Sequence, residues 1–332
     1  MRPALLNTGL AVLALGLFVL SLLVGPADLR FDESILGLFA AAQYHGEGAG
    51  IIMREIRLPR ALLGLGIGIS LGLSGAVLQG FLRNPLAEPG IIGVSATAAL
   101  GAVAVFYSGL AGSSLYALPA GALIGALTAV LILLAIAARQ GSTLTLILAG
   151  VALSSLAGAL TSLVLNLSPN PFAAYEIIFW LLGSLKDRSM EHVALALPLM
   201  ALGWLLIALS ARAIDALSLG EEAAASLGIH MGRARFLIVA GVALSVGAAT
   251  AVAGTIGFIG LVVPHLIRPL TDRLPSSLLL PAALGGAALL LAADSAARLV
   301  LPAGELNVGV LTALIGAPFF LWLVMRVRRE ML

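Results

Sequence analysis

The chain has 332 residues, of which 61% are hydrophobic and only 10% are charged, and its formal net charge is +2. Soluble domains are about half apolar and about a quarter charged, so this composition excludes an ordinary soluble domain and favours a polytopic membrane protein. The small net charge gives no basis for a nucleic-acid surface. The absence of cysteine excludes disulfides, thiolate metal sites and cysteine nucleophiles.

A bilayer span needs about 20 mostly apolar residues, and it must be helical because lipid cannot satisfy its backbone polar groups. About ten such runs predict an all-α polytopic membrane protein. They are Leu5–Val24, Ala61–Leu82, Ile91–Leu110, Leu115–Ala138, Ser142–Leu165, Met190–Ala211, Phe236–Ala253, Thr255–Leu270, Ser277–Ala296 and Leu306–Val327. The first run lacks a signal-peptide cleavage site, so we interpret it as a retained span. Gly25–Met53 is predicted to be a polar connection, and Phe172–Leu185 a half-helix too short to cross.

Ten spans place both termini on one side, and more of the 18 basic residues fall on that side than on the other. The positive-inside rule therefore predicts cytoplasmic termini in a bacterial inner membrane. Residues 1–332 are predicted to form one transmembrane domain. Within it, 57–165 and 233–327 share an order of basic residues, small-residue span, Pro/Gly break and further span. Their opposite orientations predict an inverted repeat.

The segment 212–235 is a polar island between two blocks of spans. Within it, Glu221 and Glu222 suit the positive end of a short helix and Gly228 suits its C-cap. Such a short helix is marginal alone in water. We therefore favour a docking surface for a soluble cytoplasmic partner over a free solvated loop.

Basic residues also gather on the opposite side, where the positive-inside rule does not favour them. Arg54, Arg57 and Arg60 stand at the mouth of one span, and Arg298 lies outside another. Two interpretations of these arginines are open. They are either snorkelling anchors at helix ends or an outward patch that binds carboxylates of a soluble partner. Asp294 lies one turn before Arg298, which predicts a local ion pair.

The remaining polar residues near the spans can each be explained by a structural role. Asn84 and Glu88 flank a Pro/Gly turn and either cap the next helix or serve another role. His265 is interpreted as a buried hydrogen-bonding residue rather than a proton relay. The fifth span carries polar side chains that bond to their own backbone or face a pore, namely Ser154, Ser155, Thr161, Ser162 and Asn166.

Several blocks of this sequence occur in an order that resembles a known family. They are RLPR, SGAVLQGFLRNPLAEPGIIGVSATAALGA, LGEEAAASLGI, GTIGFIGLVVPHLIRPL, LLAADSAARLV and ELNVGVLTALIGAPFFLWL. Together they are similar to the permeases of ABC importers for ferric siderophores, haem and vitamin B12. The resemblance covers the chain from about Arg57 to Arg326.

The resemblance implies a homodimer that binds two cytoplasmic ATPase subunits and receives its ligand from a periplasmic binding protein. It implies no cofactor on this chain, with ATP-Mg held by the ATPase. Arg57, Arg60 and Arg298 would dock the binding protein, and the fifth span and following half-helix would line the path. Asn84, Leu86 and Thr143 would lie near a cytoplasmic gate. The residues implied to couple to the ATPase are Leu219, Gly220, Glu221, Glu222, Ala225, Leu227 and Gly228.

The sequence carries no Walker motif, so it predicts a transport subunit without catalytic or metal residues. We expect ATP-driven import of an iron chelate, either haem or a ferric siderophore, with vitamin B12 as the alternative. An ion-coupled secondary transporter would need carboxylates or a lysine within its spans. An intramembrane hydrolase using Ser74 and His265 would need further groups that the sequence does not supply.

Overall fold

The computed structural model describes residues 3–25, 27, 29–39, 48–114, 116–138, 143–168, 171–272, 274–300 and 306–330, and the regular elements in these ranges are all helical. This confirms the predicted fold class. The helices are α1 (Pro3–Leu23), α2 (Phe31–Phe39), α3 (Gly48–Ile51), α4 (Leu58–Phe81), α5 (Val94–Tyr107), α6 (Ala117–Ala138), α7 (Thr143–Asn166), α8 (Pro171–Leu181), α9 (Met190–Leu209), α10 (Ala211–Leu217), α11 (Glu221–Ser226), α12 (Met231–Ala253), α13 (Ile259–Ile267), α14 (Leu279–Val300) and α15 (Val308–Glu330). A π-helical turn at Ile52–Arg57 (η2) precedes α4. Short 3-10 turns stand at Pro89–Ile92 (η3), Leu110–Gly112 (η4), Arg268–Leu270 (η5) and Ser276–Leu278 (η6).

The described residues contain seven helical stretches long and apolar enough to cross a membrane, and three shorter apolar helices. Together they account for the predicted number of about ten spans. The predicted polar connection Gly25–Met53 is more structured than expected, because it contains α2, α3 and the start of η2. The acidic first turn of α2 explains part of this. Glu33 accepts a hydrogen bond from the backbone N–H of Arg30 at 2.9 Å, which caps the helix start.

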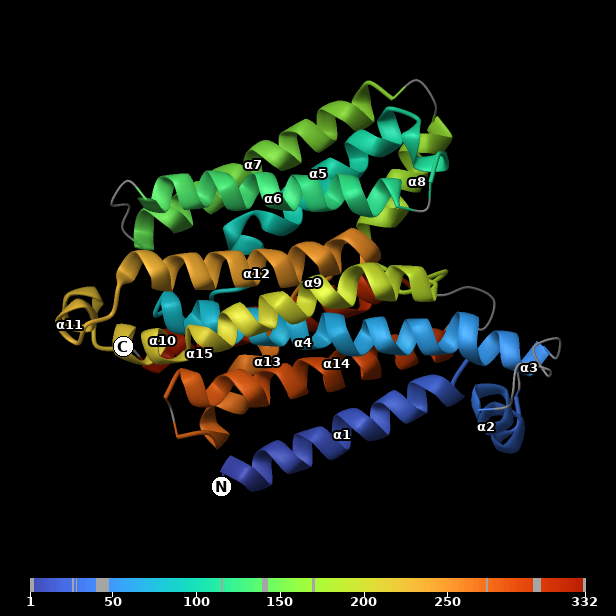
Figure 1. The fold of residues 1–332 in the computed structure, drawn as a ribbon, viewed down its shortest axis with the longest axis horizontal. Coiled ribbons are helices and arrows are strands. Elements are labelled where there is room, and N and C mark those ends of the chain that lie inside the picture. Colours follow the sequence, from blue (N-terminus) through green and yellow to red (C-terminus); the bar gives the residue numbers. More distant parts are fainter. Residues whose placement is uncertain are drawn as a thin grey trace.

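Helices α4 and α12 form the centre of the bundle (Figure 1). Helix α4 packs on α14, α13 and α9, whereas α12 packs on α9, α6 and α5. These contacts are close because glycines face the neighbouring backbones. A β-carbon on Gly75 would lie 1.9 Å from the carbonyl oxygen of Gly260, and one on Gly72 would lie 2.1 Å from that of Ala282. Small residues therefore fix the core by direct backbone approach.

The two ends of the bundle differ in what they present (Figure 1). Helices α10 and α11 lie at one end, and both ends of the chain lie toward that side. Helices α2, α3 and α8 lie at the opposite end. The predicted coupling segment and the predicted docking arginines are therefore at opposite ends of the molecule.

Candidate functional site

The polar island folds into α10 and α11, as the sequence predicts. Gly220 has φ 111° at the start of α11 and Gly228 has φ 83° at its end, so both positions suit glycine. The N–H of Gly228 donates to Ala225 and the N–H of Ile229 donates to Ala224, at 3.0 and 3.1 Å. This double hydrogen bond is a Schellman motif, which confirms Gly228 as the C-terminal capping residue.

The surface of α11 is partly apolar. Leu219 is 69% exposed and Leu227 is 64% exposed at the two ends of the helix. The other predicted coupling residues Glu222, Ala225 and Gly228 are also exposed. Glu221 instead turns back and forms a 3.1 Å ion pair with Arg235 of α12. The segment therefore offers apolar and acidic groups outward while Glu221 anchors it to a central helix.

A second connection joins this segment to the bundle, and the sequence does not predict it. Asp215 of α10 accepts hydrogen bonds from the backbone N–H and hydroxyl of Ser276, at 2.8 and 2.6 Å. Ser276 lies just before α14, so the carboxylate also faces the positive end of that helical stretch. The Pro-Ser-Ser sequence before an apolar run signals the helix start, but nothing in the sequence pairs it with Asp215.

The predicted gate residues lie at the α11 end of α4 and α7. The Asn84 side chain accepts the N–H of Leu86 at 2.9 Å, which closes a turn within the loop rather than capping the next helix. Leu86 packs on an apolar cluster that includes Leu261 of α13 and Leu323 of α15. Thr143 begins α7, and its side chain lies outside the described residues.

Glu88 reaches across from the same loop to α13. Its carboxyl accepts the backbone N–H of Phe258, and burial raises the pKa of Glu88 while this hydrogen bond opposes the rise. Phe258 has φ 68° at the N-terminus of α13, a conformation rare for a side chain of this size. A cavity of about 170 Å³ lies beside the two residues. Glu88 therefore positions the start of α13 and does not cap α5.

The arginines predicted for docking do not form an exposed patch. Arg60 binds Asp294 with both its Nε, at 3.1 Å, and its Nη2, at 2.9 Å. Arg298 pairs with the same carboxylate at 3.0 Å, which confirms the predicted local ion pair. Arg298 also donates to the backbone of Ser21 and Val24 at the end of α1. A single buried carboxylate therefore holds two cations.

Arg57 is buried in the same region, and its hydrogen bonds to described residues all go to backbone carbonyls. Its guanidinium donates to the carbonyls of Leu22, Leu23 and Ala27 at 3.0, 2.9 and 2.6 Å. Leu22 and Leu23 belong to the last turn of α1, where a helix leaves carbonyl acceptors unsatisfied, and Ala27 follows it. The three arginine side chains are therefore buried at this end of the bundle rather than exposed. The docking role of the three arginines stays a prediction.

Other polar residues near the spans have local partners. Ser155 and Ser162 of α7 donate to carbonyls four residues earlier, which agrees with the bonding to their own backbone described above. Ser74 shares a 3.1 Å hydrogen bond with Ser245 in the core. His265 packs edge-on against Phe319, with ring centroids 5.8 Å apart. The described residues contain no group of three potential metal-ligating side chains.

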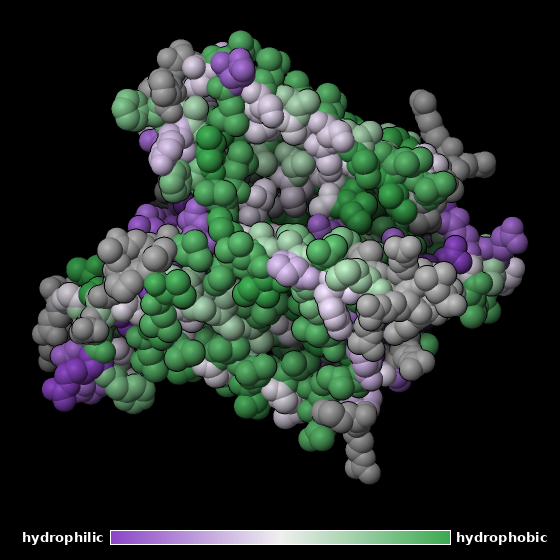
Figure 2. All heavy atoms as spheres, turned by 180° about the vertical axis from the view of Figure 1, so that it is seen from behind, coloured by the Kyte–Doolittle hydropathy of each residue, from purple (hydrophilic) through white to green (hydrophobic). Residues whose placement is uncertain are grey.

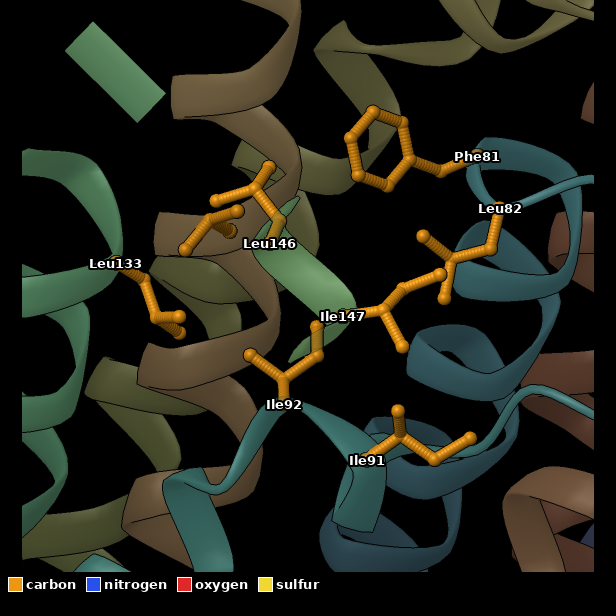
Figure 3. A pocket seen from close by; sticks show the side chains of 8 residues that line it. Phe81, Leu82, Ile91, Ile92, Leu133, Leu146 and Ile147 are labelled. Atoms are coloured by element: carbon orange, nitrogen blue, oxygen red, sulfur yellow. The ribbon is translucent and has the colours of Figure 1, made fainter. Parts of the chain in front are cut away.

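Two cavities lie near α7 and α15. The larger, about 660 Å³, is lined by residues of α15, the end of α8 and the turn at 255–258. The smaller, about 10 Å³, lies where apolar side chains of α4, η3, α6 and α7 converge (Figure 3). Seen from behind, the molecule is hollowed between an upper lobe and the main body, and apolar side chains cover most of that face (Figure 2). Large apolar surface thus remains uncovered in the single chain.

These features define a multi-span membrane permease with a structured segment projecting from one end. The chain matches the FecCD transport family over residues 12–326, and it belongs to that family. It is 44% identical to the cobalamin import permease BtuC of Halobacterium salinarum over 84% of this chain and 74% of the relative. It is 40% identical to the hemin transport permease HmuU of Yersinia pestis over 84% of each.

A solved structure agrees with this assignment. The fold matches one described as an inward-facing conformation of a metal-chelate type ABC transporter, with a TM-score of 0.86 and 33% identity over 98% of this chain and all of that chain. The protein is therefore the permease component of a type II ABC importer. It is a transport subunit whose family implies separate ATPase and substrate-binding partners. The ion-coupled transporter and hydrolase alternatives are thereby set aside.

Proposed function

We propose that this permease carries an iron chelate, either haem or a ferric siderophore, from periplasm to cytoplasm, with vitamin B12 as the alternative cargo. The observation that carries the proposal is the cavity of about 660 Å³, whose lining among the described residues has a polar side chain only at Thr255. Such a wall suits a large, partly apolar cargo that must pass without being held tightly. The haem and cobalamin named for the two relatives are both cargoes of that kind.

Coupling to the ATPase would use Leu219–Gly228. ATP-Mg would be bound by the partner subunits, and this chain would hold no cofactor of its own. Movement of α11 would reach α14 through the hydrogen bonds between Asp215 and Ser276, and α12 through the Glu221–Arg235 ion pair. A rigid-body motion of these packed helices would alternate access to the path, with Asn84, Leu86 and Thr143 near its cytoplasmic gate.

A second copy of the chain would complete the path. Helix α7 has its apolar side chains largely exposed, including Leu148, Leu156 and Leu163. Helix α8 and part of α15 border the large cavity. We place the path between two copies at these helices, in a bacterial inner membrane with both termini in the cytoplasm. The inverted relation of 57–165 and 233–327 is part of the same proposal.

The binding protein would dock at the opposite end, over Arg57, Arg60 and Arg298. Their guanidinium donors are occupied by Asp294 and by carbonyls near the end of α1. Direct ion pairs with carboxylates of the binding protein would therefore require the chain after α1 to move. Arg57 is the most readily released of the three, because its partners are neutral carbonyls rather than a carboxylate.

Transport in proteoliposomes tests the cargo. Vesicles would contain this permease with its ATPase, and a matched binding protein would deliver haem, a ferric siderophore or cobalamin. ATP-dependent uptake of haem or the ferric siderophore supports the proposal. Uptake of cobalamin alone would select the alternative cargo, and uptake of none of them would refute the proposed cargo class.

A further inference from the structure

A separate polar cavity of about 150 Å³ lies at the end of the bundle away from α11. It is enclosed by the ends of α6, α9 and α12 and by the chain between α8 and α9. Trp180 and Ser114 form part of its wall, together with the ionisable residues Asp187, Arg188 and His192. None of these belongs to the coupling, docking or gate residues.

The guanidinium of Arg188 has no partner in this cavity. Its Nε is fully enclosed and has no hydrogen-bond acceptor, and no ion pair or hydrogen bond joins its side chain to a described residue. Burial lowers the pKa of Arg188, and Asp187 opposes that change. Arginine nevertheless stays protonated in proteins. The exposed Asp187 is thus a weak counter-charge for this enclosed guanidinium, and a bound anion beside it would be favourable.

His192 supplies a second donor to the same space. Its Nδ1 accepts the backbone N–H of Ser189 at 3.2 Å, which assigns the ring hydrogen of the neutral imidazole to Nε2. His192 is the third residue of α9 and takes part in a capping box with Ser189. The ring therefore lines the cavity near the positive end of a 20-residue helix, where anions are favoured.

The acidic groups nearby do not satisfy these donors. Asp187 borders the cavity, but its side chain is exposed and makes no ion pair with Arg188, although both residues are described. Glu191, in the first turn of α9, is also exposed and is not part of the cavity wall. Asp187 weakens the positive potential without filling the space.

We propose that this cavity binds an anionic oxygen group, a carboxylate or a phosphate, between Arg188 and His192. Arginine is suited to bind such a group through two parallel N–H donors. The volume admits one small group and does not admit a whole metal chelate. Free phosphate, a phospholipid headgroup and a carboxylate on the cargo share this chemistry. The site is independent of the proposed cargo, because it depends only on residues of this chain.

Thermal unfolding of the intact chain in a phosphate-free, phospholipid-free detergent provides the test. Inorganic phosphate is titrated at constant ionic strength, with chloride as the reference anion. The wild type should show a saturable rise in Tm. Arg188→Gln should raise the phosphate concentration that gives half of this rise by about ten-fold or more, because a charge-assisted pair is lost. Lys186→Gln removes an exposed cation two residues away and should behave as wild type. Asp187→Asn should tighten binding.

Two further arms separate the sources and guard against misfolding of the variant. Acetate in place of phosphate tests the carboxylate, and added phosphatidylglycerol tests a headgroup, which would produce the Arg188-dependent shift without free phosphate. In wild-type protein labelled with ¹⁵N-histidine, phosphate should move the His192 resonance, identified by its absence from His192→Gln. No shift of that resonance together with equal Tm responses in wild type and Arg188→Gln would overturn the proposal.

Discussion

Helices α4 and α7 have the same length, 24 residues, and both are apolar enough to span a membrane. Yet of an 18-residue apolar segment in the stretch that contains α4, 83% is buried inside the chain. For the corresponding segment of α7, only 11% is buried. The difference follows from what surrounds them. Helix α4 is enclosed by α14, α13, α9 and α12, whereas α7 contacts mainly α5, α6 and η3.

Apolar character alone therefore does not distinguish a core helix from an interface helix. Glycines that meet backbone atoms mark α4 as a helix whose position is fixed by its neighbours. Helix α7 has one such glycine, Gly150, which faces the backbone of η3, whereas Gly158 further along has no atom within 4 Å of the position where a β-carbon would stand. We therefore expect α4 to be held rigidly by its neighbours and most of α7 to face lipid or a second copy.

The largest effect is expected from Gly75→Val on α4. The first added carbon would stand 1.9 Å from a backbone oxygen of α13, so the helices would have to separate. We expect destabilisation above about 3 kcal/mol, since overpacking against backbone cannot be relieved by a side-chain rotation. Yield and Tm in detergent measure this. The matched change Gly158→Val on α7 should leave the Tm near wild type. An equal drop in Tm for both variants would contradict the contrast between α4 and α7.

The next effect concerns the buried charges at the ends of α4 and α14. Asp294→Ala leaves Arg60 and Arg298 buried without their carboxylate, and should destabilise the chain by about 3–5 kcal/mol. The exposed pair between Asp32 and Arg30 provides the control. Asp32→Ala should change stability by about 1 kcal/mol or less. Chemical unfolding in mild detergent compares the two variants, and a small effect of Asp294→Ala would contradict the network described above.

Some features of these regions can be predicted from the sequence, and others cannot. Helix positions, the capped α11 and the Asp294–Arg298 pair follow from local patterns of apolar, acidic and glycine residues. The partners of Arg57 and Arg298 near the end of α1 do not, because backbone carbonyls leave no mark in a sequence and these lie 30 to 277 residues away. The cavity beside Arg188 could not be predicted either, because its walls come from four segments that are distant in the sequence.

A smaller effect is expected on the exposed face of α7. Changing Leu148, Leu156 and Leu163 together to alanine should weaken dimer formation by about ten-fold. This corresponds to a loss of about 1.4 kcal/mol of interface free energy. The Tm of the single chain should barely move. Mass photometry in nanodiscs reports the dimer fraction. Leu15→Ala on α1, which is also exposed, is the control; an unchanged dimer in the α7 variant would place the second copy elsewhere.

The smallest effect is a pH dependence at Glu88. Burial raises its folded-state pKa above the ordinary value of 4.5, so the protonated form is favoured on folding. Its contribution to stability is therefore fully present below 4.5 and is lost as pH rises through the folded-state pKa. Glu88→Gln keeps an acceptor for Phe258 and cannot ionise, so it should lack this decline. Identical pH profiles of Tm would contradict the assignment.

We infer that α11 carries the ATPase signal into the packed helices through Asp215 and Glu221. The most direct measurement is ATPase activity of the co-purified complex in nanodiscs, with and without loaded binding protein. Leu219→Asp with Leu227→Asp should abolish stimulation or release the ATPase, because it places charge on the two exposed apolar contacts of the segment. Leu15→Asn, far from α11, should retain stimulation. Full stimulation in the α11 variant would contradict the account.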